Sequence, residues 1–284
     1  STKFHDGHKL DFVGTILIFF GLLGIAYGLI SGPVWGWSNP LVATSLIVGV
    51  VMFCLFIFSS FKIKNPLVPL EIFKSPLVVG ANLATLTLYF ALAGVIFFMI
   101  LNFQQIQHYS PIISGLGLLP TILIITFLSG PMGALADKIG PRLPMIFGPA
   151  TVAFGMALLA ISGRNANYFL DFFPGLTLFG LGMALVIAPL TKSALAVEPK
   201  YSGSASGVNN AVARVAGLLA VALLGAIVLS LFTNNLTNKV YSSNLENDQK
   251  EVILSQKNDL GDISIPANFD REARITSKII IEDS

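Results

Sequence analysis

The chain has 284 residues, of which 54% are hydrophobic and only 11% are charged, and its formal net charge is +2. An ordinary soluble domain contains about 25% charged residues, so this composition excludes a soluble globular enzyme. The apolar residues also fall in long blocks instead of short periodic stripes, and no Lys, Arg, Asp or Glu occurs from Ser75 to Ala136. The sequence therefore predicts a polytopic membrane protein.

Seven apolar segments are long enough to cross a bilayer. A spanning helix needs about 20 apolar residues to traverse a hydrocarbon core about 30 Å thick. The segments are Phe12 to Ile30, Pro40 to Phe61, Leu77 to Leu101, Ile112 to Ala136, Leu143 to Ile161, Tyr168 to Leu190, and Ser204 to Phe232. Lipid cannot satisfy unpaired backbone groups, and the segments are too long for barrel strands. The predicted fold class is an all-α membrane protein with seven transmembrane helices.

Residues 1–10 form a polar lead-in, and the first two spans occupy residues 11–61. The first span carries a stripe of glycines that would admit a neighbouring backbone closely: Gly14, Gly21 and Gly28, with Gly24 beside them. Similar spacings predict close contacts in the last two spans, at Gly180, Ala184 and Ala188 and at Gly203 and Gly207. The lone cysteine, Cys54, excludes a disulfide framework and a thiolate metal cluster, and we interpret it as a small apolar packing residue.

A connector at residues 62–75 divides the two leading spans from the five later ones. Its lysines, Glu71 and its prolines suit a segment outside the membrane better than a continuing helix. Four more prolines interrupt later spans: Pro120 and Pro131 in the fourth, and Pro174 and Pro189 in the sixth. Neighbouring helices can satisfy the carbonyls that such prolines free, and transporters use these breaks as hinges or binding sites. Hinges and simple kinks remain alternatives here.

Arg214 is the one ionisable residue well inside a span, about 15 Å along the helix from Ser204. Ionisable groups are costly inside a bilayer, which makes Arg214 a candidate buried functional charge. Asn209, Asn210 and Gly217 give the same helix a small, polar face, which predicts that Arg214 faces the bundle interior or an aqueous cavity. The alternative is that Arg214 extends to the headgroups or pairs with the carboxyl end of a helix.

The distribution of basic residues predicts how the chain lies in the membrane. In a seven-span arrangement, nine basic residues lie on one side: Lys3, Lys9, Lys62, Lys64, Lys74, Lys138, Arg142, Lys192 and Lys200. Only Arg164 lies in a short loop on the other side. The positive-inside bias therefore places the amino end in the cytoplasm and residues 233–284 outside, in a multi-pass protein of the cell (inner) membrane. The polar composition of residues 233–284 predicts a mostly flexible or weakly ordered tail.

The sequence offers little for enzymatic chemistry. All three histidines lie outside the spans or at their edges, and no zinc-protease, nucleophile-elbow or phosphate-loop pattern occurs. We therefore expect no catalytic residue, no metal site, no cofactor and no nucleic-acid partner.

The strongest local signal is the loop after the fourth span, at residues 133–142. A helix ends there in a tight glycine turn on the basic side, with an acid and two cations that can pair locally and with adjacent helix ends. We interpret this loop as a latch whose candidate residues are Gly133, Asp137, Lys138, Gly140 and Arg142.

At this loop the chain resembles the major facilitator superfamily, whose signature reads Gly-x-Leu-Ala-Asp-Arg/Lys-x-Gly-x-Arg/Lys. Other segments are similar to its fourteen-span drug:proton antiporters: Asn102-Phe103-Gln104, Ser110-Pro111, Leu118-Leu119-Pro120, and Gly203 to Gly207 with Asn210 and Arg214. The resemblance implies that the first two spans are the extra linker helices between the two halves of the family. Residues 76–232 would then be five helices of a partial carboxyl-terminal transport bundle.

The same resemblance implies that residues 233–284 are a truncated outer loop. It also implies that the amino-terminal half, where the family carries its proton-coupling acids, is missing from this chain. Both ends of the sequence fit this expectation, because the chain opens at Ser1 without Met and closes on an apolar run with a short acidic stub.

The implied function is export of amphipathic organic compounds in exchange for protons by alternating access, driven by the proton gradient. The expected partners are a small amphipathic substrate, protons, membrane lipids and the missing half. A polar side chain in a span avoids lipid by facing the interior, which nominates five cavity-lining residues: Asn82, Tyr89, Asn102, Gln104 and Asn210. Two alternatives remain: a non-transporting scaffold or remnant whose outward tail binds a partner, and a carrier of the same superfamily for another small solute.

Overall fold

The computed structural model describes residues 11–63, 66–163, 166–257, 260, 263–266 and 269–283. The predicted lead-in at residues 1–10, Lys64 and Arg164 lie outside these ranges. The long helices are α1 (Phe12–Trp35), α2 (Pro40–Lys62), α3 (Pro76–Leu101), α5 (Leu119–Ile139), α6 (Arg142–Ala160), α7 (Phe173–Ala194) and α8 (Ser202–Ser242). The shorter ones are η1 (Leu70–Lys74), η2 (Asn102–Ile106), α4 (Pro111–Gly117), η3 (Tyr168–Phe172), η4 (Pro199–Tyr201), α9 (Asn247–Ser255) and α10 (Arg271–Asp283).

The seven predicted spans are confirmed. Within the described residues, seven helical segments are long and apolar enough to cross a membrane, and they coincide with the predicted ones. The fourth segment is broken at Leu118 into α4 and α5, and Pro120 lies in the first turn of α5. Pro174 likewise opens α7, whereas Pro131 and Pro189 lie inside continuous helices. Two of the four predicted interruptions are therefore helix boundaries.

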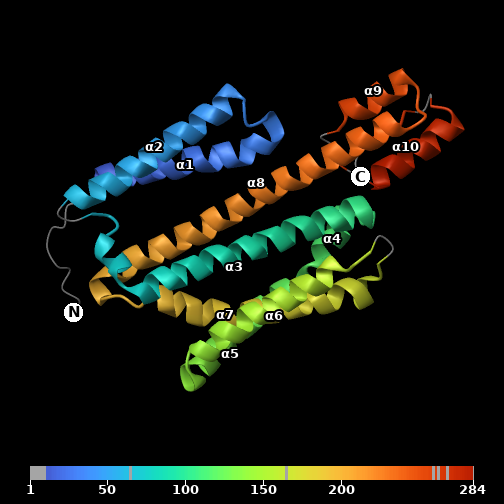
Figure 1. Ribbon diagram of the computed structural model, residues 1–284. Coiled ribbons are helices and arrows are strands. Elements are labelled where there is room, and N and C mark those ends of the chain that lie inside the picture. Colours follow the sequence, from blue (N-terminus) through green and yellow to red (C-terminus); the bar gives the residue numbers. More distant parts are fainter. Residues whose placement is uncertain are drawn as a thin grey trace.

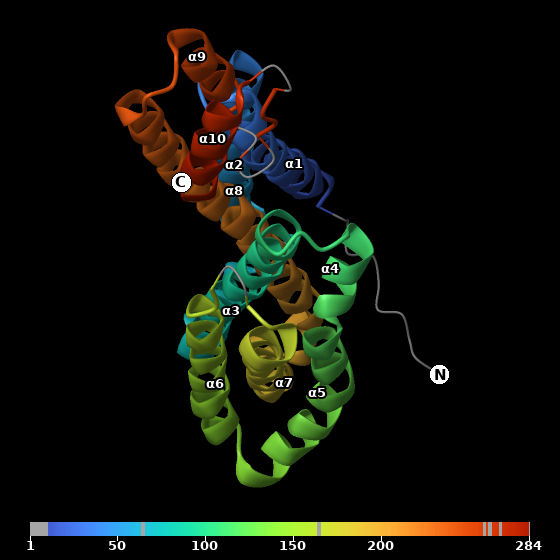
Figure 2. The ribbon, with the colours of Figure 1, turned by 90° about the vertical axis from the view of Figure 1, so that its right-hand side faces the viewer.

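The helices form a central bundle with a separate hairpin beside it. In Figure 2, α7 is surrounded by α3, α5 and α6, and it packs against all three. In Figure 1, α8 runs alongside α3 on the far side of that bundle, and the hairpin of α1 and α2 lies beyond α8. Burial reflects this order, because 56% of the apolar stretch of α7 is buried but only 17–28% of each other span. We expect most of the remaining apolar surface to face lipid.

Glycines set the close approach of α1 to α2. A Cβ on Gly24 would lie 2.8 Å from the carbonyl oxygen of Ser45 and 2.9 Å from the Cα of Gly49, so only glycine fits there. Gly21 and Gly28 also face α2, which confirms that the predicted stripe packs against a neighbouring helix. Gly14 differs, because its neighbour is the carboxylate of the capping residue Asp11.

Packing in the later spans agrees only in part with the predicted small-residue contacts. Gly180 does contact a neighbour, since a Cβ there would lie 3.1 Å from the Thr121 backbone. The prediction for Gly203 and Gly207 is wrong, because among the described residues no atom outside the adjacent backbone of their own helix lies within 4 Å of a Cβ at either position. Cys54 is exposed on α2 and does not fill the interior, in contrast to its predicted packing role. Small residues at regular spacing permit a close helix contact, but the contact forms only where another helix packs against them.

The connector between α2 and α3 holds the hairpin and the bundle together. Val68 and Ile72 are buried with Phe56 in a small cluster against α1, α2 and the start of α8. The backbone N–H of Leu67 donates to the Asp11 carboxylate at 3.1 Å, and its carbonyl accepts from the Ser204 hydroxyl at 2.9 Å. The connector thereby joins the first turns of α1 and α8.

A hydrogen bond between side chains adds to this joint. The Tyr201 hydroxyl donates to the Glu71 carboxylate, and this bond is the main cause that lowers the pKa of Glu71. Lys74 and Lys200 lower it further by charge. Glu71 is therefore ionised at neutral pH and acts as the acceptor in this contact.

The prediction of a mostly flexible tail is wrong for the described residues. Helix α8 continues past Phe232 to Ser242, and α9 and α10 fold back onto its end (Figure 1). Apolar side chains from the three helices and the segments between them form a buried cluster that includes Leu236, Val240, Ile253, Phe269 and Ile280. The polar average of the tail did not reveal these residues, of which Leu236 and Val240 lie four residues apart on one face of α8.

Candidate functional site

The predicted glycine turn joins α5 to α6. Gly140 has φ = +85°, a backbone conformation that side chains with a Cβ rarely adopt, and α6 begins directly afterwards at Arg142. The glycine therefore ends α5 and reverses the chain within three residues. In Figure 1 this turn lies at the same end of the molecule as the connector and the start of α8; we call this end the Asp137 side.

Asp137 pairs with a lysine from another helix. The Nζ of Lys192, in the last turn of α7, lies 2.6 Å from both carboxylate oxygens of Asp137. The Asp137 side chain remains 60% exposed and the Lys192 side chain 56% exposed. Such an exposed pair contributes about 0.2–1 kcal/mol, so it can open and close at little cost.

The close approach of α5 and α7 at Gly133 and Ala188 explains the position of the pair. A Cβ on Gly133 would lie 2.8 Å from the Cβ of Ala188, so α5 and α7 approach closely at this level. Asp137 and Lys192 each lie four residues further along, one helical turn closer to the Asp137 side. The sequence predicted that Asp137 pairs locally or with an adjacent helix end, and in the structure its partner is on the adjacent helix. That partner, Lys192, was not among the residues predicted for the latch.

The two cations of the loop itself do not take part in this pair. Lys138 and Arg142 are exposed, and neither has an ion-pair partner within the described part of the chain. They remain available to groups outside the described residues.

Helices α3 and α8 share a buried polar contact within the spans. The amide nitrogen of Asn209 donates to the Thr85 hydroxyl at 3.1 Å, and Thr85 donates in turn to the Ala81 carbonyl. Asn82 lies beside Thr85 and donates to the Val78 carbonyl, while its side-chain oxygen is buried and has no partner among the described atoms. Asn82 is therefore buried, and it bonds within its own helix.

The five predicted cavity residues do not meet in one place. Asn82 and Asn102 are about 30 Å apart along α3 and η2, which is a full membrane thickness. Tyr89 lies between them and is half-buried, as are Asn102 and Gln104 at the end away from the Asp137 side. Asn210 is exposed on α8. One shared site formed by all five is thus excluded in this conformation.

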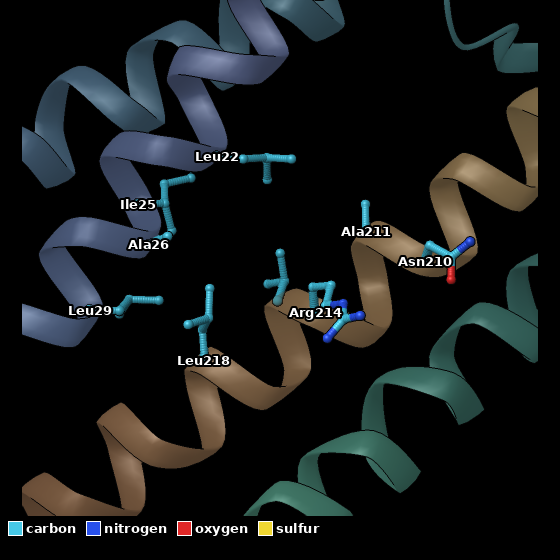
Figure 3. Close-up of a pocket in the computed structure, with 9 residues that line it drawn as sticks. Leu22, Ile25, Ala26, Leu29, Asn210, Ala211, Arg214 and Leu218 are labelled. Carbon is cyan, nitrogen blue, oxygen red and sulfur yellow. The ribbon is translucent and has the colours of Figure 1, made fainter.

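Arg214 is exposed, and the prediction that it is a buried charge is wrong. It lies with Asn210 at the edge of a groove of about 240 Å³ between α8 and α1, whose walls are almost wholly apolar (Figure 3). The polar face predicted for α8 is divided, because Asn209 hydrogen-bonds toward α3, whereas Asn210 and Arg214 border the groove beside α1 and their polar ends point away from it (Figure 3). Asn209 and Arg214 are five residues apart, which on a helix separates their directions by about 140° around the helix axis, so they cannot share a face.

The family model of the Major Facilitator Superfamily matches residues 12–221, which contain the glycine turn, Asp137, Lys192 and the central bundle. The chain belongs to the major facilitator superfamily. Together with the seven apolar spans, this membership identifies a multi-pass membrane protein. The resemblance noted in the signature loop is therefore confirmed.

Several relatives of the chain are named for drug resistance or export. The chain is 27% identical to the multidrug resistance protein Stp of Mycobacterium tuberculosis over 78% of its length and 41% of the relative. It is 31% identical to the puromycin resistance protein pur8 of Streptomyces alboniger over 77% and 44%, respectively. It is 29% identical to the tetracenomycin C resistance and export protein of Streptomyces glaucescens over 84% and 44%. The chain thus spans less than half the length of these relatives.

Proposed function

We propose that the chain is part of an efflux transporter that exports amphipathic organic compounds in exchange for protons by alternating access. The observation that carries this proposal is the similarity to relatives named for multidrug resistance and for resistance to and export of specific compounds. That similarity extends over most of the helical bundle. The proposed partners are the substrate, protons, membrane lipids and a second helical bundle from the rest of the transporter.

The latch suggests how this part of the transporter takes part in the cycle. In alternating access, one bundle rocks against the other around a site near the middle of the membrane. The pair of Asp137 and Lys192 fastens the ends of α5 and α7 on the Asp137 side, and it is exposed enough to exchange partners. A contact of about 1 kcal/mol or less can bias two conformations without locking either of them.

The proposed location is the cell membrane, with the amino end and the Asp137 side in the cytoplasm and the helices α9 and α10 outside. The support is the concentration of lysine and arginine on the Asp137 side. The driving force would be the proton gradient, with no bound cofactor.

An efflux assay on the intact protein tests the function. Cells that express it are loaded with a fluorescent amphipathic dye, and dye loss is followed with and without a proton ionophore. We expect faster dye loss than in cells without the protein, and we expect the ionophore to abolish the difference. Export that persists without a gradient would overturn proton antiport, and uptake of a solute in place of export would favour the alternative of another carrier.

A further inference from the structure

Arg214 is a cation deep in a span, and the described part of the chain provides no counter-charge for it. Its guanidinium has no ion-pair or hydrogen-bond partner among the described residues, whereas Asp137 and Glu198 are each paired with a lysine. The residue lies about 18 Å along α8 from Ser202, which is close to the middle of a hydrocarbon core about 30 Å thick. An unpaired charge is costly at that depth, so an anionic partner from outside the described residues would stabilise it.

Arg214 and Asn210 present their polar groups on an open side of α8. The two residues are four positions apart and therefore lie on one face of the helix. Both are exposed, and in Figure 3 their polar ends point away from α1. Asn209, at the next position, points elsewhere and donates to Thr85 of α3. A guanidinium and an amide thus lie one turn apart on a side of α8 that the described residues leave uncovered.

A second copy of this chain cannot supply the anion at this depth. The seven spans contain a single acid, Asp171, which lies three residues from the outer end of the sixth. Its carboxylate accepts a hydrogen bond from the backbone N–H of Asn167 at 2.6 Å. Asp171 is therefore placed near the membrane surface, whereas Arg214 lies near the middle of its span.

A carboxylate on another helix suits this position better than a lipid phosphate does. Phosphates lie at the membrane surface, so the arginine side chain would have to extend far along α8 to reach one. The amide of Asn210 would still face hydrocarbon without a hydrogen bond. A helix can bring both a carboxylate and a polar side chain to mid-depth. The chain spans less than half the length of its relatives, so we expect the intact protein to contain further helices.

We propose that this face of α8 packs against a membrane helix from the rest of the intact protein, and that a carboxylate of that helix pairs with Arg214. The inference rests on the second bundle of the proposed function and adds the chemistry of its contact with this one. It does not depend on export or on protons. The planar guanidinium can donate two parallel hydrogen bonds to one carboxylate, and Asn210 can bond to a polar group of the same helix.

A double-mutant cycle on the intact protein identifies the carboxylate. Each Asp or Glu in the spans outside this chain is changed to Asn or Gln, alone and together with Arg214→Gln, and thermal unfolding is measured in detergent. We expect Arg214→Gln to lower the unfolding midpoint by on the order of 5–10 °C, because it leaves a buried carboxylate unpaired. One acidic position should show a similar loss, and the double variant should lose less than the two single losses added together.

Two other variants separate the pair from a general effect of charge. Arg214→Lys keeps the charge and should retain part of the stability. Lys62→Gln removes a cation at the end of α2, where the lysine lies over the Phe58 ring, and should leave the unfolding midpoint unchanged. Wild-type stability of Arg214→Gln, or strictly additive losses at every acidic position, would overturn the proposal. A loss of stability that appears only in nanodiscs of anionic lipid would assign the charge to a lipid phosphate and would also overturn it.

Cross-linking gives a second readout that does not depend on stability. Arg214→Cys is combined with a cysteine at the acidic position that the cycle identifies, in a background with Cys54→Ala and no other cysteine. A short bis-maleimide should join the two positions, and it should not join position 214 to a cysteine one half-turn away on the same partner helix. Failure to join the coupled positions would overturn the proposal. Neither readout uses a dye or a gradient, so a coupled, cross-linked pair in a protein that does not export would refute only the proposed function.

Discussion

Replacing Gly182 with alanine is expected to destabilise the central bundle by about 1–3 kcal/mol, the usual cost of overpacking a tight contact. A Cβ at this position would lie 2.6 Å from the backbone nitrogen of Val152 and 2.7 Å from the Gly148 carbonyl oxygen. Both atoms belong to the backbone of α6, so the helices must move apart. Because α7 is the most buried span, the loss spreads to its contacts with α3 and α5.

Gly207→Ala is the matched control for this substitution. Gly207 is also helical, but no atom of the described residues outside its own helical turn lies within 4 Å of a Cβ there. The change should leave stability unaltered or raise it by up to about 1 kcal/mol, because alanine favours a helix more than glycine does. The measurement is thermal unfolding of each purified protein in the same detergent. Equal stability of Gly182→Ala and the wild type would show that α6 and α7 are not in this close contact.

Asp137→Asn in the intact protein is expected to reduce efflux about two- to fivefold while leaving membrane insertion and thermal stability nearly unchanged. The pair with Lys192 is exposed and contributes about 0.2–1 kcal/mol, which is too little to decide whether the protein folds. The same energy can shift the balance between two transport conformations by up to about fivefold. Dye efflux and protein amount are measured in the same cells.

The exchange of the two charges tests whether the pair itself matters. The double variant Asp137→Lys with Lys192→Asp restores an ion pair at the same place, and it should recover part of the efflux that each single change loses. Recovery would distinguish the pair from a separate role of either residue. Full efflux in Asp137→Asn, or loss of the protein from the membrane, would contradict the latch.

The length of the apolar runs explains why the seven spans could be predicted. Lipid permits few alternatives to a helix over so many apolar residues, and tertiary packing cannot override that constraint. The end of the last span was harder to place, because Leu236 and Val240 continue the helical spacing in a polar stretch. Average composition indicated disorder there, whereas the spacing of a few buried residues produced α9 and α10.

The local part of the site could be predicted, and its long-range part could not. Gly140 and Arg142 adjoin Asp137 in the sequence, so the turn follows from turn chemistry alone. Lys192 is 55 residues from Asp137, and only the packing of Gly133 against Ala188 brings them together. For the polar residues in the spans, the need to avoid lipid did not predict which neighbouring helix or groove each side chain would adjoin. Asn82 avoids lipid by burial and a hydrogen bond within its own helix, whereas Arg214 is exposed at the edge of a groove.

Cysteine labelling in sealed cells tests most directly whether the spans cross the membrane with the Asp137 side in the cytoplasm. Ile139→Cys introduces an exposed thiol at the glycine turn, and Tyr241→Cys introduces one near the end of α8. Both are made in a background in which Cys54 is changed to alanine and any other cysteines of the intact protein are also replaced. A membrane-impermeant maleimide should label position 241 in intact cells and position 139 only after permeabilisation. Labelling of position 139 in intact cells would contradict the orientation, and with it the place of the latch in the proposed transport cycle.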